Sequence, residues 1–214
     1  MDSSGTDLRE LANRTYEAYK QTIPDDTKHL LDRYRLVDVA LKVVGVGSVG
    51  NLCLILLLEG RDSTDPLFLQ MKQAIPSVLE EYFNSSQYTN QGQRAVEGQR
   101  LMQTVSDIFL GWVKGSKTGK DFYMRQLRDW KGSADVEHLD AAGLYHLARL
   151  CGWTLARAHA RSGDPVAIAG YLGNKDTLDK AMFDFATAYA DQNKRDFEAF
   201  TEAISSGKLE AREG

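Results

Sequence analysis

Apolar residues recur every three or four positions near the start of the chain, with charged residues between them. This spacing places the apolar side chains on one side of a helix, so residues 7–22 are predicted to form an amphipathic helix. Pro24 ends it, and Asp25 and Asp26 open a short second helix by supplying negative charge to its first turn. Farther on, β-branched and alternating residues predict three antiparallel strands, over residues 36–44, 52–59 and 67–72.

A helix and a β-hairpin are predicted to follow these strands. A short helix at residues 76–82 begins with a proline in its first turn, and a longer helix covers residues 94–104. The glycine-bounded residues 115–120 suit the turn of a hairpin between strands at 108–114 and 121–127. We expect the longer helix to turn its apolar side chains inward, namely Ala95, Val96, Leu101, Met102 and Val105.

The remaining chain is predicted to be helical, over residues 139–161, 166–172 and 175–205. The expected fold class is therefore α+β: a five-stranded antiparallel sheet that carries one packed helix, followed by a helical C-terminal part. We predict four successive regions, namely a helical lead-in (1–34), a small lobe that contains the sheet (35–128), the helical part (129–207) and a disordered tail (208–214).

The composition is that of an ordinary globular protein, with 43% hydrophobic and 26% charged residues. The formal net charge of −4 arises from well-mixed acidic and basic residues, which argues against a nucleic-acid-binding protein. Cys53 and Cys151 have neither zinc-ligand spacing nor a disulfide pattern, and they suit a reducing compartment. No signal peptide is recognisable, and the longest apolar run, residues 52–58, is too short to cross a bilayer. We therefore expect a soluble cytoplasmic protein that binds neither nucleic acid nor membrane.

A glycine-rich segment at residues 43–50 lies between the first two predicted strands. Glycine lets a backbone turn sharply and present its N–H groups to phosphate oxygens. A dinucleotide-binding fold would require a helix after the last glycine, whereas the short apolar run that follows favours a strand. A glycine turn between two strands, with Lys72 on the third strand, matches the arrangement of protein kinases. The alternative is a hairpin whose glycines serve only its turn.

Lys72 needs an anionic partner if its strand is half-buried, because an unpaired charge is costly to desolvate. Glu97 is the best candidate, since a helix over residues 94–104 would place it along the apolar face, whereas Glu80 and Glu81 are expected on an exposed short helix. A charge-assisted contact between Lys72 and Glu97, worth about 1.5–3 kcal/mol, would hold the lysine over a phosphate site. Alternatively, Lys72 ends an edge strand in water and Glu97 is a solvated helix residue.

Five long motifs carry a resemblance to one family, namely VVGVGSVG at residues 43–50, GQRAVEGQRLMQ at 92–103, DIFLGW at 107–112, YMRQLRD at 123–129 and ARAHARSGD at 156–164. The chain resembles an uncharacterised bacterial family, domain of unknown function 2252, from about residue 31 to about residue 200. The resemblance implies a kinase-like protein about twice as long, in which a Gly-Asp-x-His segment and an aspartate-rich metal-binding segment precede the glycine loop. We expect this chain to correspond to the C-terminal half alone.

One segment imitates a kinase catalytic loop: residues 159–164, followed by Asp184-Phe185-Ala186. We reject this assignment because no asparagine stands five residues after Asp164 and because an apolar helical stripe places Asp184 on the solvent side. The four histidines lack metal-ligand spacing, and no metal-binding residue is predicted.

The expected function is that of the ATP-binding portion of a kinase-like phosphotransferase. In this hypothesis Lys72 grips the phosphates, Glu97 orients Lys72, and the phosphates are cradled by Gly45, Gly47, Ser48 and Gly50. The chain alone is expected to be inactive, because the catalytic and metal-binding aspartates are absent, and magnesium would bind only if a missing half supplied ligands. The alternative is a non-catalytic remnant or partner-binding module. The expected partners are a complementary N-terminal half or a second copy in a homo-oligomer.

Overall fold

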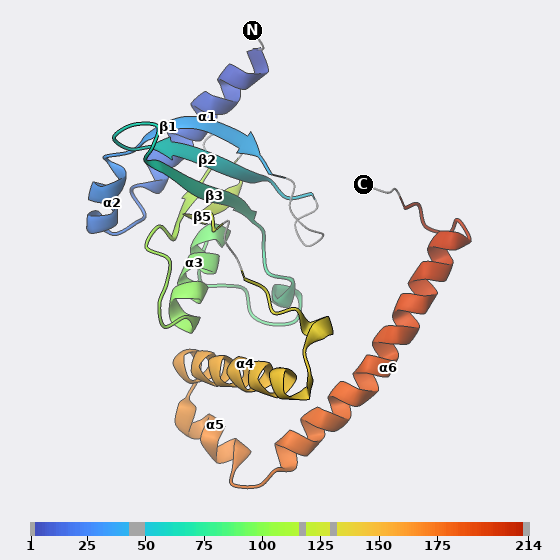
Figure 1. The fold of residues 1–214 in the computed structure, drawn as a ribbon. Coiled ribbons are helices and arrows are strands. Elements are labelled where there is room, and N and C mark those ends of the chain that lie inside the picture. Colours follow the sequence, from blue (N-terminus) through green and yellow to red (C-terminus); the bar gives the residue numbers. More distant parts are fainter. Residues whose placement is uncertain (1–2, 43–49, 116–118, 129–131, 212–214) are drawn as a thin grey trace. The chain divides into compact units, whose positions relative to one another are not determined.

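The computed structural model describes residues 3–42, 50–115, 119–128 and 132–211 (Figure 1). The chain divides into two compact units, Met1–Ser162 and Gly163–Gly214. The first unit contains the whole sheet, and each unit is described by itself below. This division places the helix at Ala141–Ser162 with the sheet, whereas the predicted helical part began at residue 129.

A five-stranded antiparallel sheet forms the centre of the first unit, in the strand order β1-β2-β3-β5-β4. It confirms the predicted five strands and the α+β class. The strands are β1 (Arg35–Leu41), β2 (Cys53–Glu59), β3 (Pro66–Ala74), β4 (Gly111–Lys114) and β5 (Asp121–Gln126). Each falls within or close to its predicted range, because alternating apolar residues mark a half-buried strand and glycine-rich turns separate one strand from the next.

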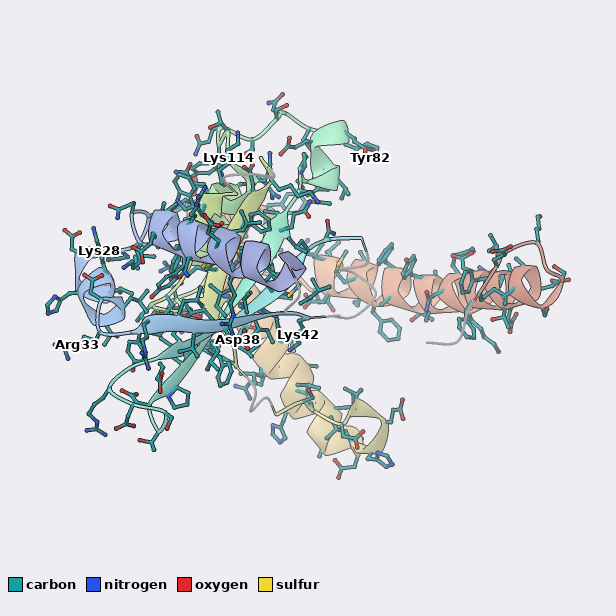
Figure 2. The ribbon with its side chains drawn as sticks, turned by 90° about the horizontal axis from the view of Figure 1, so that it is seen from above. Lys28, Arg33, Asp38, Lys42, Tyr82 and Lys114 are labelled. Carbon is teal, nitrogen blue, oxygen red and sulfur yellow. The ribbon has the colours of Figure 1, made fainter. Side chains whose placement is uncertain are left out.

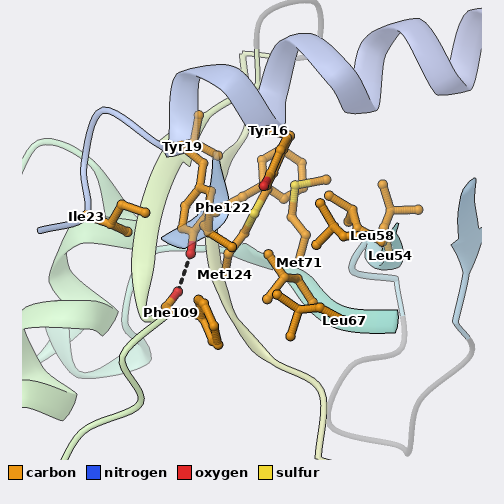
Figure 3. Close-up of a cluster of buried hydrophobic side chains, with 14 residues drawn as sticks. Tyr16, Tyr19, Ile23, Leu54, Leu58, Leu67, Met71, Phe109, Phe122 and Met124 are labelled. Carbon is orange, nitrogen blue, oxygen red and sulfur yellow. Dashed lines mark hydrogen bonds between the residues drawn. The ribbon is translucent and has the colours of Figure 1, made fainter. Parts of the chain in front are cut away.

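One face of the sheet packs against the helices α1 (Ser3–Tyr19) and α2 (Asp25–Leu31), which lie where two N-terminal helices were predicted. Successive strand residues point to opposite faces, and on this face every second side chain of β2 is buried. The core joins residues of the two helices, and of the turn between them, to residues of four strands, namely Tyr16, Tyr19, Ile23, Leu31, Leu54, Leu56, Leu58, Leu67, Leu69, Met71, Val113, Phe122 and Met124 (Figure 3). Burial of each leucine contributes about 1.5–3 kcal/mol to folding.

The helix α3 (Gln91–Met102) contacts β3, β4 and β5. Asn90 caps its first turn, since the side-chain oxygen accepts a hydrogen bond from the N–H of Gln93 at 2.9 Å. Asp121 at the start of β5 accepts hydrogen bonds from the Asn90 amide and the Gln91 N–H, at 2.9 and 2.7 Å. Gly92 brings α3 close to β5, because a Cβ atom at this position would lie 2.1 Å from the carbonyl oxygen of Phe122. These contacts fix the start of α3 on the sheet.

The prediction of which residues of α3 face inward is largely wrong. Val96 is fully buried, but Leu101 and Met102 are 49% exposed and Val105 is 84% exposed. Only Gly92 and Val96, one turn apart, are buried within α3, so the helix meets the sheet along a narrow stripe near its first half. Leu101 and Met102 belong to its last turn, and Val105 follows its end.

The first unit contains three further helical segments, one before α3 and two after β5. The predicted short helix after β3 is observed as one 3-10 turn, η2 (Val78–Glu81), which Ser77 caps. After β5, the 3-10 turn η3 (Val136–His138) leads into α4 (Ala141–Ser162), which contacts α3. The helix predicted at residues 139–161 is confirmed by α4, whereas η3 was not predicted.

The second unit contains α5 (Pro165–Leu172) and α6 (Thr177–Ser205), as predicted. Asp164 caps α5 by accepting hydrogen bonds from the N–H groups of Val166 and Ala167. Its carboxylate therefore has a structural role, which agrees with rejection of the catalytic-loop assignment. Asp184 in α6 is exposed, but so are Met182 and Phe185 of the supposed inner stripe, at 54% and 61%. Exposure therefore does not separate the two sides of α6.

Candidate functional site

A cavity of about 320 Å³ lies where the start of β2, the end of β3 and the first half of α3 meet. Its wall includes strand, loop and helix residues, among them Leu52, Cys53, Lys72, Arg94, Ala95 and Tyr123. The volume is at the lower end of the range typical of pockets for small molecules. All of these residues belong to the first unit.

Lys72 lines this cavity from β3. It pairs with Cys53 of β2 on one side and with Tyr123 of β5 on the other, so it lies on an interior strand and not on an edge. Met71, its neighbour in sequence, points into the core under α1, and alternation therefore directs Lys72 to the opposite face. Within the described ranges, the ammonium group of Lys72 has no hydrogen bond or ion pair. The half-buried cation is therefore available to an anionic ligand.

The glycine-rich segment can be followed only at its end. Gly45, Gly47 and Ser48 lie outside the described residues, so their predicted role stays a prediction. Gly50 has a φ angle of 80°, in the left-handed region that favours glycine, and a Cβ atom there would meet nothing within 4 Å. Asn51 and Leu52, which follow it directly, line the cavity. The segment thus leads into the site.

The predicted ion pair between Lys72 and Glu97 is not formed. Glu97 instead accepts a hydrogen bond from Arg100 at 3.1 Å, three residues later on the same helix. Arg100 also donates to the carbonyl oxygen of Leu110 at 2.7 Å, which holds its guanidinium beside Glu97. A partner one turn away is reached without any rearrangement of the fold, so it competes well with a lysine on another element.

Glu80 also departs from its predicted environment. It was expected to be exposed on a short helix, but it is half-buried, and its Oε1 atom is shielded from solvent without a hydrogen-bond partner among the described residues. Glu81 is exposed, as expected. Neither carboxylate lines the cavity.

Arg94 is a second cation in the wall that sequence reasoning did not assign. Its guanidinium donates hydrogen bonds to the Gln91 side chain at 2.7 Å and to the Ile75 carbonyl at 3.0 Å. The described lining contains no aspartate or glutamate, so Lys72 and Arg94 give the cavity a positive character. Arg94 lies in one of the quoted motifs, but only the sheet and helix arrangement brings it to Lys72.

Tyr123 is the other site residue that the sequence did not reveal. Burial raises the pKa of its phenol, Arg125 lowers this pKa, and Cys53 raises it. The net upward direction keeps the hydroxyl protonated at neutral pH, so that it can donate a hydrogen bond into the site. Its recognition required the strand register, because Tyr123 is opposite Lys72 only once β3 and β5 pair.

A magnesium site is not evident in this part of the chain. Within the residues that the structure describes, no three histidine, cysteine, aspartate or glutamate side chains are grouped as metal ligands would be. The part of the cavity wall that the structure describes offers no carboxylate. The residues present therefore fit an organic anion and do not fit a divalent cation.

The comparison with family models decides the affiliation of the chain. The model described as "Uncharacterized protein conserved in bacteria (DUF2252)" matches residues 3–203. The chain belongs to this family. No curated protein and no solved structure matches it. None of the helices of this DUF2252 chain in the described ranges combines the length and hydropathy that a bilayer-spanning segment needs.

Proposed function

We propose that this chain is the nucleotide-binding portion of a kinase-like phosphotransferase and that ATP is its ligand. The observation that carries the proposal is the position of Lys72, a half-buried cation without an ion pair among the residues that the structure describes, in a cavity that begins directly after Gly50. A phosphate chain supplies the negative charge that Lys72 and Arg94 lack among the described residues. The protonated phenol of Tyr123 adds a hydrogen-bond donor beside the same cavity.

The order of the elements supports the same proposal. The glycine-rich segment connects β1 and β2, the lysine lies on β3, and α3 comes between β3 and β4. In protein kinases a glycine-rich loop covers the phosphates, a lysine of the third strand contacts them, and a glutamate of the following helix pairs with this lysine. Glu97 of α3 is the corresponding acid in the proposal. It would have to exchange Arg100 for Lys72 when the nucleotide binds.

Binding without catalysis is the proposed behaviour of the chain on its own. Phosphoryl transfer requires a carboxylate that orients the acceptor hydroxyl and further ligands that hold magnesium against the phosphates. The described lining of the cavity supplies neither. In this proposal the catalytic groups come from another segment or partner of the same family of proteins.

Thermal unfolding in the presence of ATP tests the proposal. A ligand that binds only the folded state at a hundred times its Kd stabilises the protein by about 2.7 kcal/mol, so Tm should rise with ATP concentration. Lys72→Ala should abolish most of this rise. Lys114→Ala, which removes an exposed lysine at the end of β4, should leave it unchanged (Figure 2). No rise in Tm for the unaltered chain, or an equal rise in Lys72→Ala, would refute nucleotide binding at this site.

A partner-binding module is the second candidate, and one surface favours it. The segment around η2 exposes four large apolar side chains, namely Val78 (71%), Leu79 (58%), Tyr82 (78%) and Phe83 (73%), and Figure 2 shows Tyr82 projecting from this turn. Clustered exposed apolar groups mark interaction sites more often than isolated ones do. If this surface joins two copies of the chain, sedimentation velocity should show a concentration-dependent dimer that Tyr82→Ser disrupts. A monomer at all concentrations would exclude self-association through this segment.

A further inference from the structure

We infer that a groove between α3 and α4 binds an amphipathic organic anion, with an apolar body and one acidic group, and that this ligand regulates the Lys72 cavity. The first part of the inference stands on the groove alone. The regulatory part rests on the proposed nucleotide-binding function. Both helices belong to the first unit, and they contact each other (Figure 1).

The size and lining of the groove suit a small molecule. Its volume is about 710 Å³, within the usual range of ligand pockets and more than twice that of the Lys72 cavity. The walls are mainly apolar, with Ala95, Met102, Val105, Trp153, Leu155 and Ala158 among them. Met102, Val105 and Trp153 are 49%, 84% and 56% exposed, so this apolar surface is open to solvent. Covering it with an apolar body is favourable.

The charge of the groove selects an anion. Arg157 and Arg94 line it, and its described lining contains no aspartate or glutamate. The Arg157 guanidinium lies 4.5 Å from the centre of the Trp153 ring and donates a hydrogen bond to Thr104 at 2.9 Å. These two contacts hold the cation in place without neutralising it, because neither partner is a carboxylate. An acidic group of the ligand would neutralise the Arg157 guanidinium through a charge-assisted hydrogen bond.

A neighbouring arginine holds the two walls together. Arg161 of α4 donates hydrogen bonds to the carbonyl oxygens of Leu101 at 2.8 Å and Arg100 at 3.4 Å, at the end of α3. Terminal carbonyl groups of a helix otherwise lack intrahelical partners, so this contact fastens α4 to α3. Arg161 is thereby occupied with backbone groups, and Arg157 remains for the ligand.

The groove and the Lys72 cavity share one wall. Arg94 and Ala95 line both, on successive positions of α3. A ligand that contacts these residues from the α4 side restrains the helix that borders the nucleotide cavity on its other side. By thermodynamic reciprocity, each ligand must then change the affinity of the other by the same factor.

A cavity-filling substitution gives the first test. Gly98 lines the groove, and a Cβ atom at this position would meet nothing within 4 Å, so Gly98→Leu introduces a side chain at an open position of the groove wall. Replacement of a glycine within a helix should also favour folding. Gly152→Leu is the matched control, because Gly152 lies in α4 with equally open space and does not line the groove.

The probe is anilinonaphthalene sulfonate, whose fluorescence reports binding, and N-phenylnaphthylamine is its uncharged counterpart. We expect saturable binding of the sulfonate that Gly98→Leu reduces at least tenfold and Gly152→Leu leaves unchanged. Arg157→Gln should weaken the sulfonate about tenfold, as loss of a charge-assisted hydrogen bond predicts, and should leave the uncharged probe within about twofold. Equal binding to Gly98→Leu, or equal loss of both probes in Arg157→Gln, would overturn the inference.

Occupation of the groove by a second copy of the chain is the competing outcome. Sedimentation velocity of the unaltered chain and of Gly98→Leu distinguishes it, since a dimer that Gly98→Leu dissociates, with no probe bound, would overturn the small-molecule site. ATP titrations with and without the sulfonate then test regulation, and the expected result is a change of at least threefold in ATP affinity that is absent in Gly98→Leu. If the sulfonate binds as described but ATP does not bind at all, the groove stands and the proposed function falls. If both bind independently, the regulatory part is wrong.

Discussion

Tyr19 of α1 donates a hydrogen bond from its buried hydroxyl group to the carbonyl oxygen of Phe109, which lies 90 residues farther along the chain (Figure 3). This contact connects the N-terminal helix to the residues just before β4. Tyr19→Phe should lower the free energy of unfolding by about 1–3 kcal/mol, because it leaves a buried carbonyl oxygen without its partner. Urea denaturation measures the change. Tyr34→Phe, which removes a more exposed hydroxyl bonded to Asp65, is the matched control and should cost less.

Alkaline pH should destabilise the fold through the same helix. Burial raises the pKa of Tyr19 and of Tyr16 well above the value of about 10 that a tyrosine has in an unfolded chain. Above pH 10 the unfolded state therefore loses protons that the folded state retains, and stability falls as pH rises by about 1.4 kcal/mol per pH unit for each tyrosine. Below pH 10 neither tyrosine makes the free energy of unfolding depend on pH. Urea denaturation at a series of pH values should show the decline, and Tyr19→Phe should make it shallower; a flat profile above pH 10 would contradict it.

Two glycines of α3 should respond oppositely to alanine. At Gly92 the new methyl group would lie 2.1 Å from the Phe122 carbonyl oxygen, a backbone atom that cannot move aside without displacing β5. Gly92→Ala should therefore destabilise by about 1–3 kcal/mol. At Gly98 the methyl group meets open space, so Gly98→Ala should stabilise by about 0.5–1 kcal/mol through helix propensity. Thermal unfolding monitored by circular dichroism compares the two variants, and changes of the same sign would show that α3 does not approach β5 in this way.

The ion pair between Glu97 and Arg100 should oppose nucleotide binding if Glu97 is the acid that Lys72 needs. Arg100→Met releases Glu97 and should raise ATP affinity about two- to fivefold, since a partly exposed ion pair is worth about 0.2–1 kcal/mol. In a Glu97→Gln background the same Arg100 substitution should have no effect. A double-mutant cycle of ATP affinities measures this coupling. Equal effects of Arg100→Met in both backgrounds would show that Glu97 plays no such part.

The strands could be predicted from the sequence because their signals are local. Alternating apolar residues in β3 and the glycine-bounded turn before β5 specify strands and turns without knowledge of the rest of the chain. The side of α3 that meets the sheet was harder to predict. Its apolar residues are spread around the helix, and the small residue Gly92, with only Val96 beside it, makes the buried contact. A pattern that ranks side chains by hydrophobicity does not favour a glycine as a contact residue.

The sequence predicted only those residues of the candidate site that have a local signal. Gly50 and Lys72 carry recognisable signals in the sequence, whereas Arg94 and Tyr123 reach the site only through the placement of α3 and the pairing of β3 with β5. The predicted ion pair between Lys72 and Glu97 is wrong because Glu97 contacts Arg100, which lies within one turn of the same helix. Knowing the side of the helix on which Glu97 lies does not reveal whether it pairs with a residue of the same helix or with one on a distant strand.

The strand order has a consequence for synthesis of the chain. β5 is the last strand to be made, yet it lies between β3 and β4. While residues 121–126 are still unmade, β3 leaves a row of unpaired N–H and C=O groups along one side. Such an edge can pair with a strand of another chain, so the sheet is open to aggregation until β5 has been made.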